Sequence, residues 1–260
     1  MTASLHVETT GDGPPLVLLH GWAMHSEMWG PLLPRLARTY RVHAVDLPGH
    51  GHSAAPAEFT LDGVVSALVP AFASCAQPLT VLGWSLGGQV AMRWALTQPT
   101  QVSRLVLVAT SPRFVAGDGW PHAMPDETLA RFGDELRASW KLTLERFLTL
   151  QLKGGEHSRA TLSALRGRIF ARGAPSPAAL AGALAVLRNA DLRHEIAGIT
   201  QPALVVSGDR DTLALPGAGG FLAEALPNGT FALIAGAAHI PFVSHADACG
   251  AALDAFLDAR

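Results

Sequence analysis

The most informative stretch of the chain runs from Leu79 to Gly88 and holds a serine between closely spaced glycines. It reads Leu-Thr-Val-Leu-Gly-Trp-Ser-Leu-Gly-Gly, so Gly83 and Gly87 flank Ser85 in a G-x-S-x-G pattern. A serine hydroxyl becomes a nucleophile for acyl transfer when a neighbouring base can take its proton. Glycines at these two positions remove side chains that would collide where a strand turns sharply into a helix. The spacing therefore predicts a nucleophilic serine at position 85.

The segments on either side of Ser85 support that interpretation. Residues 79–82 are apolar except for Thr80 and indicate a buried strand, while residues 89–98 indicate a helix. The five motif residues alone would also fit a glycine-rich turn with an incidental serine, but strand-then-helix is the setting in which this motif supplies a nucleophile. The helix also points its amino end at the serine, which favours developing negative charge there.

A base and a carboxylate follow later in the chain. Asp211 comes after a predicted strand at 203–206, and His239 lies in a loop of small residues after a predicted last strand at 231–234. Side chains that follow the carboxyl ends of parallel strands meet at one edge of the sheet. The sequence therefore predicts a catalytic triad of Ser85, Asp211 and His239, in the chain order of the α/β hydrolases.

Other residues compete for these roles. Asp209 is an alternative acid, but Asp211 has the usual spacing of three residues from the strand-ending Gly208. His245 is expected to be a surface or capping residue, and His20 a structural one.

Acyl transfer also requires donors for the oxyanion of the tetrahedral intermediate. The backbone amide that follows the nucleophile, at Leu86, is one candidate. The second is the amide of Trp22, in the His-Gly-Trp sequence that follows a predicted strand at 16–19.

Short apolar strands alternate with helices in two parts of the chain. Strands are predicted at 16–19, 42–45, 79–82, 105–108, 203–206 and 231–234, with an edge strand within 5–10, and helices at 31–40, 61–73, 89–98, 221–226 and 246–259. This alternation predicts a mostly parallel sheet with helices on both faces. Residues 112–190 instead show helical patterns at 129–152, 158–171 and 178–187. We expect an α/β-hydrolase core of residues 1–111 and 191–260 and a helical lid of residues 112–190.

Composition excludes several classes of protein. The 260 residues are 49% hydrophobic with a net charge of −2, which predicts a large core and argues against nucleic-acid binding. Neither a signal peptide nor an apolar run of about 18 residues is visible. Cys75, Cys249, His50 and His52 lack the number and spacing of metal ligands. We expect a cytoplasmic monomer without membrane contact, metal or cofactor.

Several motifs together point to a narrower family. They are Leu-Leu-His-Gly-Trp at 18–22, Val-Asp-Leu-Pro-Gly at 45–49, Leu-Gly-Trp-Ser-Leu-Gly-Gly at 82–88, Trp-Pro at 120–121, Glu-Arg-Phe-Leu at 145–148, Leu-Gln at 150–151 and Ala-Ala-His at 237–239. On these motifs the chain resembles the carboxylesterases of biotin synthesis, which remove the methyl ester from pimeloyl-acyl-carrier protein methyl ester. The resemblance covers nearly the whole chain, including the helical insertion.

The resemblance implies a serine carboxylesterase with an acyl-enzyme intermediate and an acyl-carrier protein as partner. It places the acyl chain against Trp22, Ser85, Leu86, Phe147, Leu148, Thr149, Leu150, Gln151 and His239. We also expect Trp84, with Trp22 and Phe147, to line an apolar slot for a short acyl chain. A general short-chain carboxylesterase or a lactonase of the same fold is the nearest alternative. A non-catalytic binding protein of this fold should have lost a member of the triad, and this chain retains all three.

The insertion is basic, whereas the rest of the chain is acidic. Residues 112–190 hold eleven Lys and Arg against seven Asp and Glu, and the remaining residues hold eight against fourteen. A solvated helical face would also explain such a bias, but the implied acidic partner favours a docking surface. We expect Arg146, Arg159, Arg166 and Arg168 to form it. The family has a further basic residue near Ser163 that this chain lacks, and Arg166 or Arg168 is the expected substitute.

Overall fold

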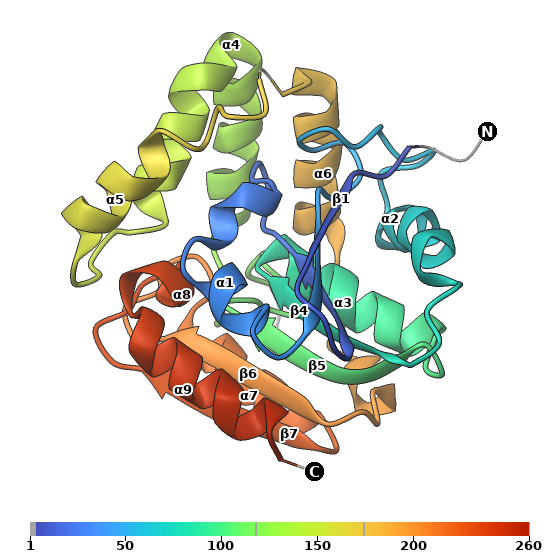
Figure 1. Cartoon of the computed structure of the whole chain (residues 1–260). Coiled ribbons are helices and arrows are strands. Elements are labelled where there is room, and N and C mark those ends of the chain that lie inside the picture. Colours follow the sequence, from blue (N-terminus) through green and yellow to red (C-terminus); the bar gives the residue numbers. More distant parts are fainter. Residues whose placement is uncertain (1–3, 118, 174, 260) are drawn as a thin grey trace.

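The computed structural model describes residues 4–117, 119–173 and 175–259, which contain a seven-stranded sheet in the order β1-β3-β2-β4-β5-β6-β7 (Figure 1). The strands are β1 (Val7–Thr10), β2 (Pro15–Leu19), β3 (Arg41–Val45), β4 (Leu79–Trp84), β5 (Val102–Val108), β6 (Ala203–Gly208) and β7 (Gly229–Ile234). Strand β1 pairs antiparallel with β3, and all other pairs are parallel. The predicted mostly parallel sheet is confirmed.

Helices cover both faces of this sheet. The α-helices are α1 (Leu32–Leu36), α2 (Leu61–Leu68), α3 (Leu86–Thr97), α4 (Asp126–Leu150), α5 (Ser158–Arg166), α6 (Pro177–Asn189), α7 (Pro216–Ala225), α8 (Pro241–Ser244) and α9 (Ala246–Leu257), with 3₁₀ turns at Ser26–Trp29, Val69–Phe72 and Ile196–Gly198. Helix α1 packs against α9 on one face, and α2 packs against α3 on the other. Every residue of the central strands β4 and β6 is buried, as expected for strands covered on both sides.

Helices α4 and α6 lie above the strands at the top of Figure 1, and α5 lies below α4 at the left. Helix α4 packs against both α5 and α6. In the described part of the chain, residues 112–190 contribute no strand to the sheet, although two isolated bridges join Val115 to Met124 and Gly117 to Trp120. None of the helices in the described ranges is long and apolar enough to cross a membrane.

Several predicted helices differ from those observed. The predicted helix at 129–152 is interrupted at Ser139, whose backbone is extended (φ −158°, ψ 83°), so α4 consists of two arms. The helix predicted at 158–171 ends at Arg166, because the chain turns at Gly167. The segment predicted as one helix at 61–73 tightens into a 3₁₀ turn that contains Pro70, which has no amide hydrogen to donate.

Candidate active site

Ser85 lies at a sharp elbow between β4 and α3. Its backbone has φ 56° and ψ −117°, a strained conformation for a residue with a side chain. Two bonds hold that conformation: the Ser85 amide donates to the carbonyl of Val108 at 3.0 Å, and the Thr110 hydroxyl donates to the carbonyl of Ser85 at 2.7 Å. A Cβ atom added to Gly87 would lie 2.0 Å from the Leu19 carbonyl oxygen, so only glycine fits there.

His239 and Asp211 form a buried pair. The imidazole Nδ1 lies 2.7 Å from Oδ2 of Asp211, and both side chains are almost fully excluded from solvent. The other carboxylate oxygen, Oδ1, accepts the backbone amides of Leu213 and Ala214 at 2.8 and 3.1 Å. Within the described residues Nε2 of His239 has no hydrogen-bond partner, and His239 and Ser85 line the same cavity. This arrangement leaves one imidazole nitrogen available to take a proton.

The structure brings Asp211, and not Asp209, to the imidazole of His239. Oδ1 of Asp209 instead accepts the backbone amide of Gly236 at 2.7 Å, which ties the ends of two neighbouring strands together. His245 lies at the start of α9, with its Nδ1 2.9 Å from the Ser244 hydroxyl.

The two predicted oxyanion donors flank the serine. Leu86 is the first residue of α3, where the helix leaves its first amides without partners. The loop with Trp22 runs close by, since a Cβ atom on Gly21 would lie 3.2 Å from Cβ of Ser85. In the part of the chain that the structure describes, neither amide donates to another backbone carbonyl. Both are therefore available to a developing oxyanion.

A narrow, mainly apolar cavity of about 10 Å³, roughly the space of one water molecule, lies beside Ser85. The core and the insertion both contribute to its lining, which consists of Trp22, Ser85, Phe114, Met124, Leu129, Phe132, Phe147, Leu184, Leu187, Leu213 and His239. Most of the lining from the insertion was not identified from the sequence. The only available signal was the apolar spacing of its helices, which does not tell which apolar residues face a cavity and which face the core.

Of residues 147–151, which were all predicted to contact substrate, only Phe147 lines this cavity. Successive helical residues point about 100° apart, so five in a row cannot share one face. Leu148 and Gln151 are buried, Thr149 is exposed, and Leu150 borders a groove on the outer surface of α4. The Gln151 carbonyl does accept the backbone amide of His239 at 3.0 Å.

Trp84, also predicted to line the cavity, lies among core aromatics instead. Its indole packs against Trp29 and Phe242, and its Nε1–H donates to the carbonyl of His239 at 2.9 Å. The ring therefore supports the backbone of the histidine rather than the wall of the cavity.

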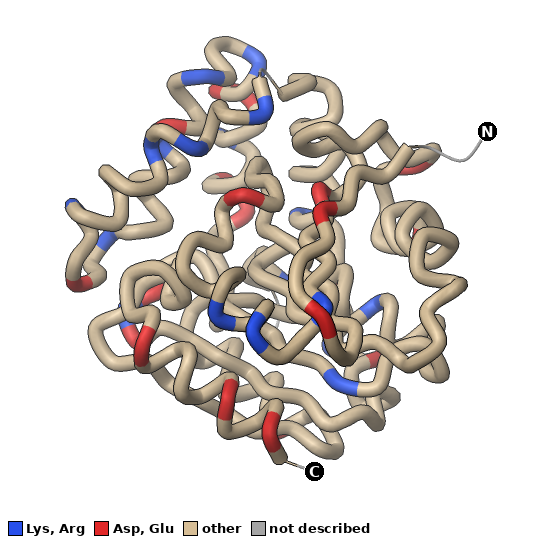
Figure 2. The backbone as a smooth tube through the Cα atoms, viewed as in Figure 1, with Lys and Arg blue, Asp and Glu red and all other residues tan. Residues whose placement is uncertain are grey.

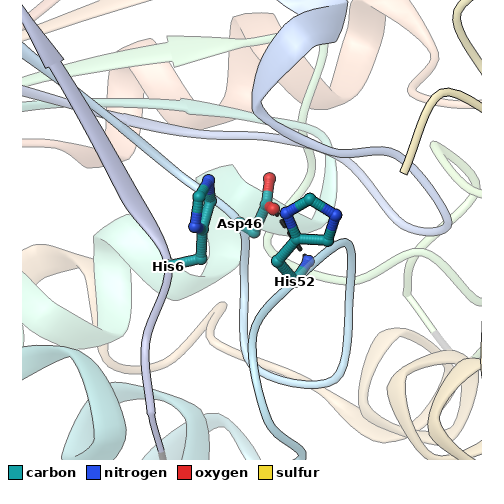
Figure 3. A group of neighbouring side chains, drawn as sticks. All are labelled: His6, Asp46 and His52. Carbon is teal, nitrogen blue, oxygen red and sulfur yellow. Dashed lines mark hydrogen bonds between the residues drawn. The ribbon is translucent and has the colours of Figure 1, made fainter. Parts of the chain in front are cut away.

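A second cluster, far from Ser85 in sequence, combines His6, Asp46 and His52, whose imidazoles lie on either side of the carboxylate (Figure 3). Nη1 of Arg172 lies 3.2 Å from Nε2 of His6 and 3.0 Å from Nδ1 of His52, and Nη2 pairs with Glu8. Burial alone would raise the pKa of Asp46, but amide hydrogen bonds outweigh it and lower that pKa to about 2. The cluster thus holds the Arg172 cation and joins the segment between α5 and α6 to the core.

The four arginines predicted to dock a partner are all exposed. Arg146 lies 3.6 Å from a carboxylate oxygen of Glu135, and Arg168 donates to the carbonyl of Glu27 at 3.3 Å. Arg159 and Arg166 make no ion pair with the described residues. Basic residues lie along α4 and α5, and on α4 four Lys and Arg alternate with five Asp and Glu (Figure 2).

Comparisons with known proteins agree on the fold and on a group of relatives. Residues 14–246 match the alpha/beta hydrolase fold family. The chain is 43% identical over 254 residues to the pimeloyl-[acyl-carrier protein] methyl ester esterase of Xanthomonas oryzae pv. oryzae (strain MAFF 311018), covering 97% of this chain and 98% of that protein. It is also 43% identical over 242 residues to the Nitrosomonas europaea protein of the same name, covering 93% and 95%.

Solved structures with the same fold carry several different names. A bromoperoxidase from Bacillus anthracis superposes with a TM-score of 0.92 at 25% identity, covering 98% of this chain and 96% of the other. An esterase from Exiguobacterium antarcticum superposes with a TM-score of 0.91 at 23% identity, covering 99% and 96%. At 23% identity the second likeness shows the fold alone.

Proposed function

The chain belongs to the alpha/beta hydrolase fold family and, within it, to the pimeloyl-[acyl-carrier protein] methyl ester esterases, and from this we propose that it hydrolyses the methyl ester of pimeloyl-acyl-carrier protein in biotin synthesis. The observation that carries the proposal is the buried pair of His239 and Asp211. Among the residues that the structure describes, Nε2 of this imidazole has no hydrogen-bond partner, and it lies in the cavity that Ser85 also lines. A non-catalytic member of this fold would not require a His–Asp pair that is both buried and hydrogen-bonded.

In the proposed reaction, the Ser85 hydroxyl attacks the ester carbonyl carbon while Nε2 of His239 takes its proton. The carbonyl oxygen becomes an oxyanion, which the amides of Trp22 and Leu86 stabilise. When the tetrahedral intermediate collapses, the imidazolium returns the proton to the methoxy group, and methanol leaves. Water then attacks the acyl-enzyme by the same route and releases the free carboxylate. Asp211 holds the imidazole in the required tautomer throughout.

We propose that residues 112–190 act as a lid that covers the acyl chain and docks the carrier protein. Phe147 from α4 and Leu184 from α6 supply apolar walls of the cavity. The exposed arginines Arg146, Arg159, Arg166 and Arg168 give the outside of the lid a positive surface. An acidic partner would be steered to such a surface, with an on-rate that falls as salt rises.

Growth without biotin tests this function. A bacterial strain that lacks its own pimeloyl-carrier methyl ester esterase should grow on biotin-free medium when it expresses the wild-type chain, and fail to grow with Ser85→Ala expressed at the same level. A wild-type protein that hydrolyses small free esters but never restores growth would instead be a general short-chain carboxylesterase.

A further inference from the structure

The peptide unit between Gly21 and Trp22, in the loop that follows β2, is held at its carbonyl oxygen by the buried side chain of His20. Nδ1 of His20 lies 2.7 Å from the Gly21 carbonyl oxygen, and Nε2 of His20 accepts the amide of Leu47 at 2.9 Å. The imidazole therefore carries its proton on Nδ1 and donates it to Gly21. The carbonyl of Gly21 and the amide of Trp22 belong to the same planar unit, so fixing one directs the other.

The side chain of the same tryptophan is anchored to the insertion. Nε1–H of Trp22 donates to the carbonyl of Leu180 in α6 at 2.9 Å. Its ring packs edge-on against Phe147 of α4, with centroids 4.8 Å apart and an interplanar angle of 82°. The residue is 1% exposed. Trp22 therefore contacts both long helices of the insertion, while its amide belongs to the loop that passes close to Ser85.

The loop needs such support because its backbone is strained. Ala23, the next residue, has φ 62°, in the left-handed region that residues with a side chain rarely adopt. A rotation that relaxed this segment would reorient the Trp22 amide and at the same time move the indole off the Leu180 carbonyl. Contact with the insertion and orientation of the amide are thus properties of one residue.

We propose that Trp22 couples the lid to the oxyanion hole, so that docking of α4 and α6 on the core holds the Trp22 amide in the position that binds the oxyanion. The inference rests on the proposed serine-esterase chemistry. Under it, Trp22 has two roles: its amide is a catalytic group, and its indole is a positioning group that acts through the lid.

Substituting Trp22→Phe tests the coupling, because phenylalanine keeps an aromatic ring against Phe147 and loses the donor to Leu180. With a short chromogenic free ester, we expect kcat to fall about tenfold and KM to stay within threefold, since complete loss of an oxyanion donor costs roughly 10²–10³ in kcat. A short trifluoromethyl ketone gives a second readout, because Ser85 Oγ bonds to its carbonyl carbon, His239 takes the proton and the oxygen becomes an oxyanion. Its inhibition constant should rise by a similar factor.

Trp94→Phe is the matched control. Trp94 is fully buried in α3, away from the cavity, and its Nε1–H donates to the side-chain oxygen of Gln101 at 2.8 Å. The Trp94→Phe variant should lose as much thermal stability as Trp22→Phe does and keep kcat within twofold of the wild-type value. If Trp22→Phe folds poorly, benzothienylalanine at position 22 removes only the N–H group and keeps the shape of the indole.

The coupling is overturned if kcat and the inhibition constant of either position-22 variant stay within twofold of wild type, or if both Trp→Phe variants lower kcat equally. These outcomes leave the proposed function intact. Conversely, a wild-type enzyme that hydrolyses the free ester but not the carrier-bound methyl ester would overturn the proposed substrate and leave the coupling to be judged on the free ester.

Discussion

Replacing Asp211 with asparagine should invert the tautomer of His239. The carboxylate uses one oxygen for Nδ1–H of His239 and the other for the amides of Leu213 and Ala214. Asparagine offers one acceptor oxygen and one NH₂ group. Because the two backbone amides need an acceptor, the oxygen stays with them and the NH₂ group faces the imidazole. Nδ1 must then accept, so the proton moves to Nε2, which can no longer take the proton of Ser85.

The size of the loss follows from that change. With the productive tautomer disfavoured, kcat should fall about 10³- to 10⁴-fold, as expected when the acid of a serine triad becomes an amide. This corresponds to roughly 4 to 5.5 kcal/mol of transition-state stabilisation. The assay is steady-state hydrolysis of a chromogenic short-chain ester, and ¹⁵N NMR of the histidine rings identifies the nitrogen that carries the proton.

Asp209→Asn is the matched control, because an amide oxygen can still accept the amide of Gly236. This variant should keep kcat within about threefold. If Asp209→Asn proved the more damaging substitution, or if Asp211→Asn kept more than a tenth of wild-type kcat, the assignment of the acid would be refuted.

Reversing the charge of Arg159 and Arg166 together should lower kcat/KM for a carrier-bound ester at least tenfold, about 1.4 kcal/mol, and leave a small free ester unchanged; equal loss on both substrates would argue against docking. Phe147→Ala should act mainly on substrate binding, with a raised KM and a smaller effect on the melting temperature. A large loss of stability at constant KM would mean that Phe147 serves only in the core. Arg172→Met should make a limited amount of trypsin cleave the insertion faster relative to the core, because the carboxylate partners of Arg172 lie in the core. An unchanged cleavage rate would mean that Arg172 does not anchor the insertion to the core. Burial lowers the pKa of His20 to about 3, so below pH 6.5 the unfolded chain binds a proton at this residue that the folded chain does not. The unfolding free energy should therefore fall as the pH drops from 6.5 toward 3, and His20 should account for up to about 2 kcal/mol of that fall at pH 5. An unfolding free energy that stays constant over this pH range would contradict the burial of a neutral imidazole.

Local rules determine the parts of the fold and of the candidate site that were predictable from the sequence. The elbow at Ser85 was predictable because its flanking glycines admit one backbone path, and the proximity of Asp211 to His239 because strand ends in a parallel sheet converge. The sheet was predictable because fully buried strands appear as short apolar runs between turns. Observed strands extend beyond the predicted ones mainly where a polar or glycine residue continues the pairing, as at Gly83 and Ser103.

The insertion was less predictable, because tertiary contacts decide its details. The break at Ser139 involves neither proline nor glycine, so no local signal marks it. Arg172 looked like one more basic residue of a charged surface, yet it is bound by side chains from three distant segments, among them Glu8 and Asp46. A run of adjacent residues such as 147–151 suggests a shared role, whereas a helix distributes them around its axis.

The central claim, a serine esterase that acts on a carrier-bound methyl ester, is tested most directly with purified components. Pimeloyl-acyl-carrier protein methyl ester is incubated with the wild-type chain or with Ser85→Ala, and the mass of the carrier protein and the released methanol are followed. The account predicts loss of the methyl group with wild type, one methanol for each carboxylate formed, and no turnover with Ser85→Ala. Equal turnover by both proteins, or an intact methyl ester with a wild-type enzyme that is active on free esters, would contradict it.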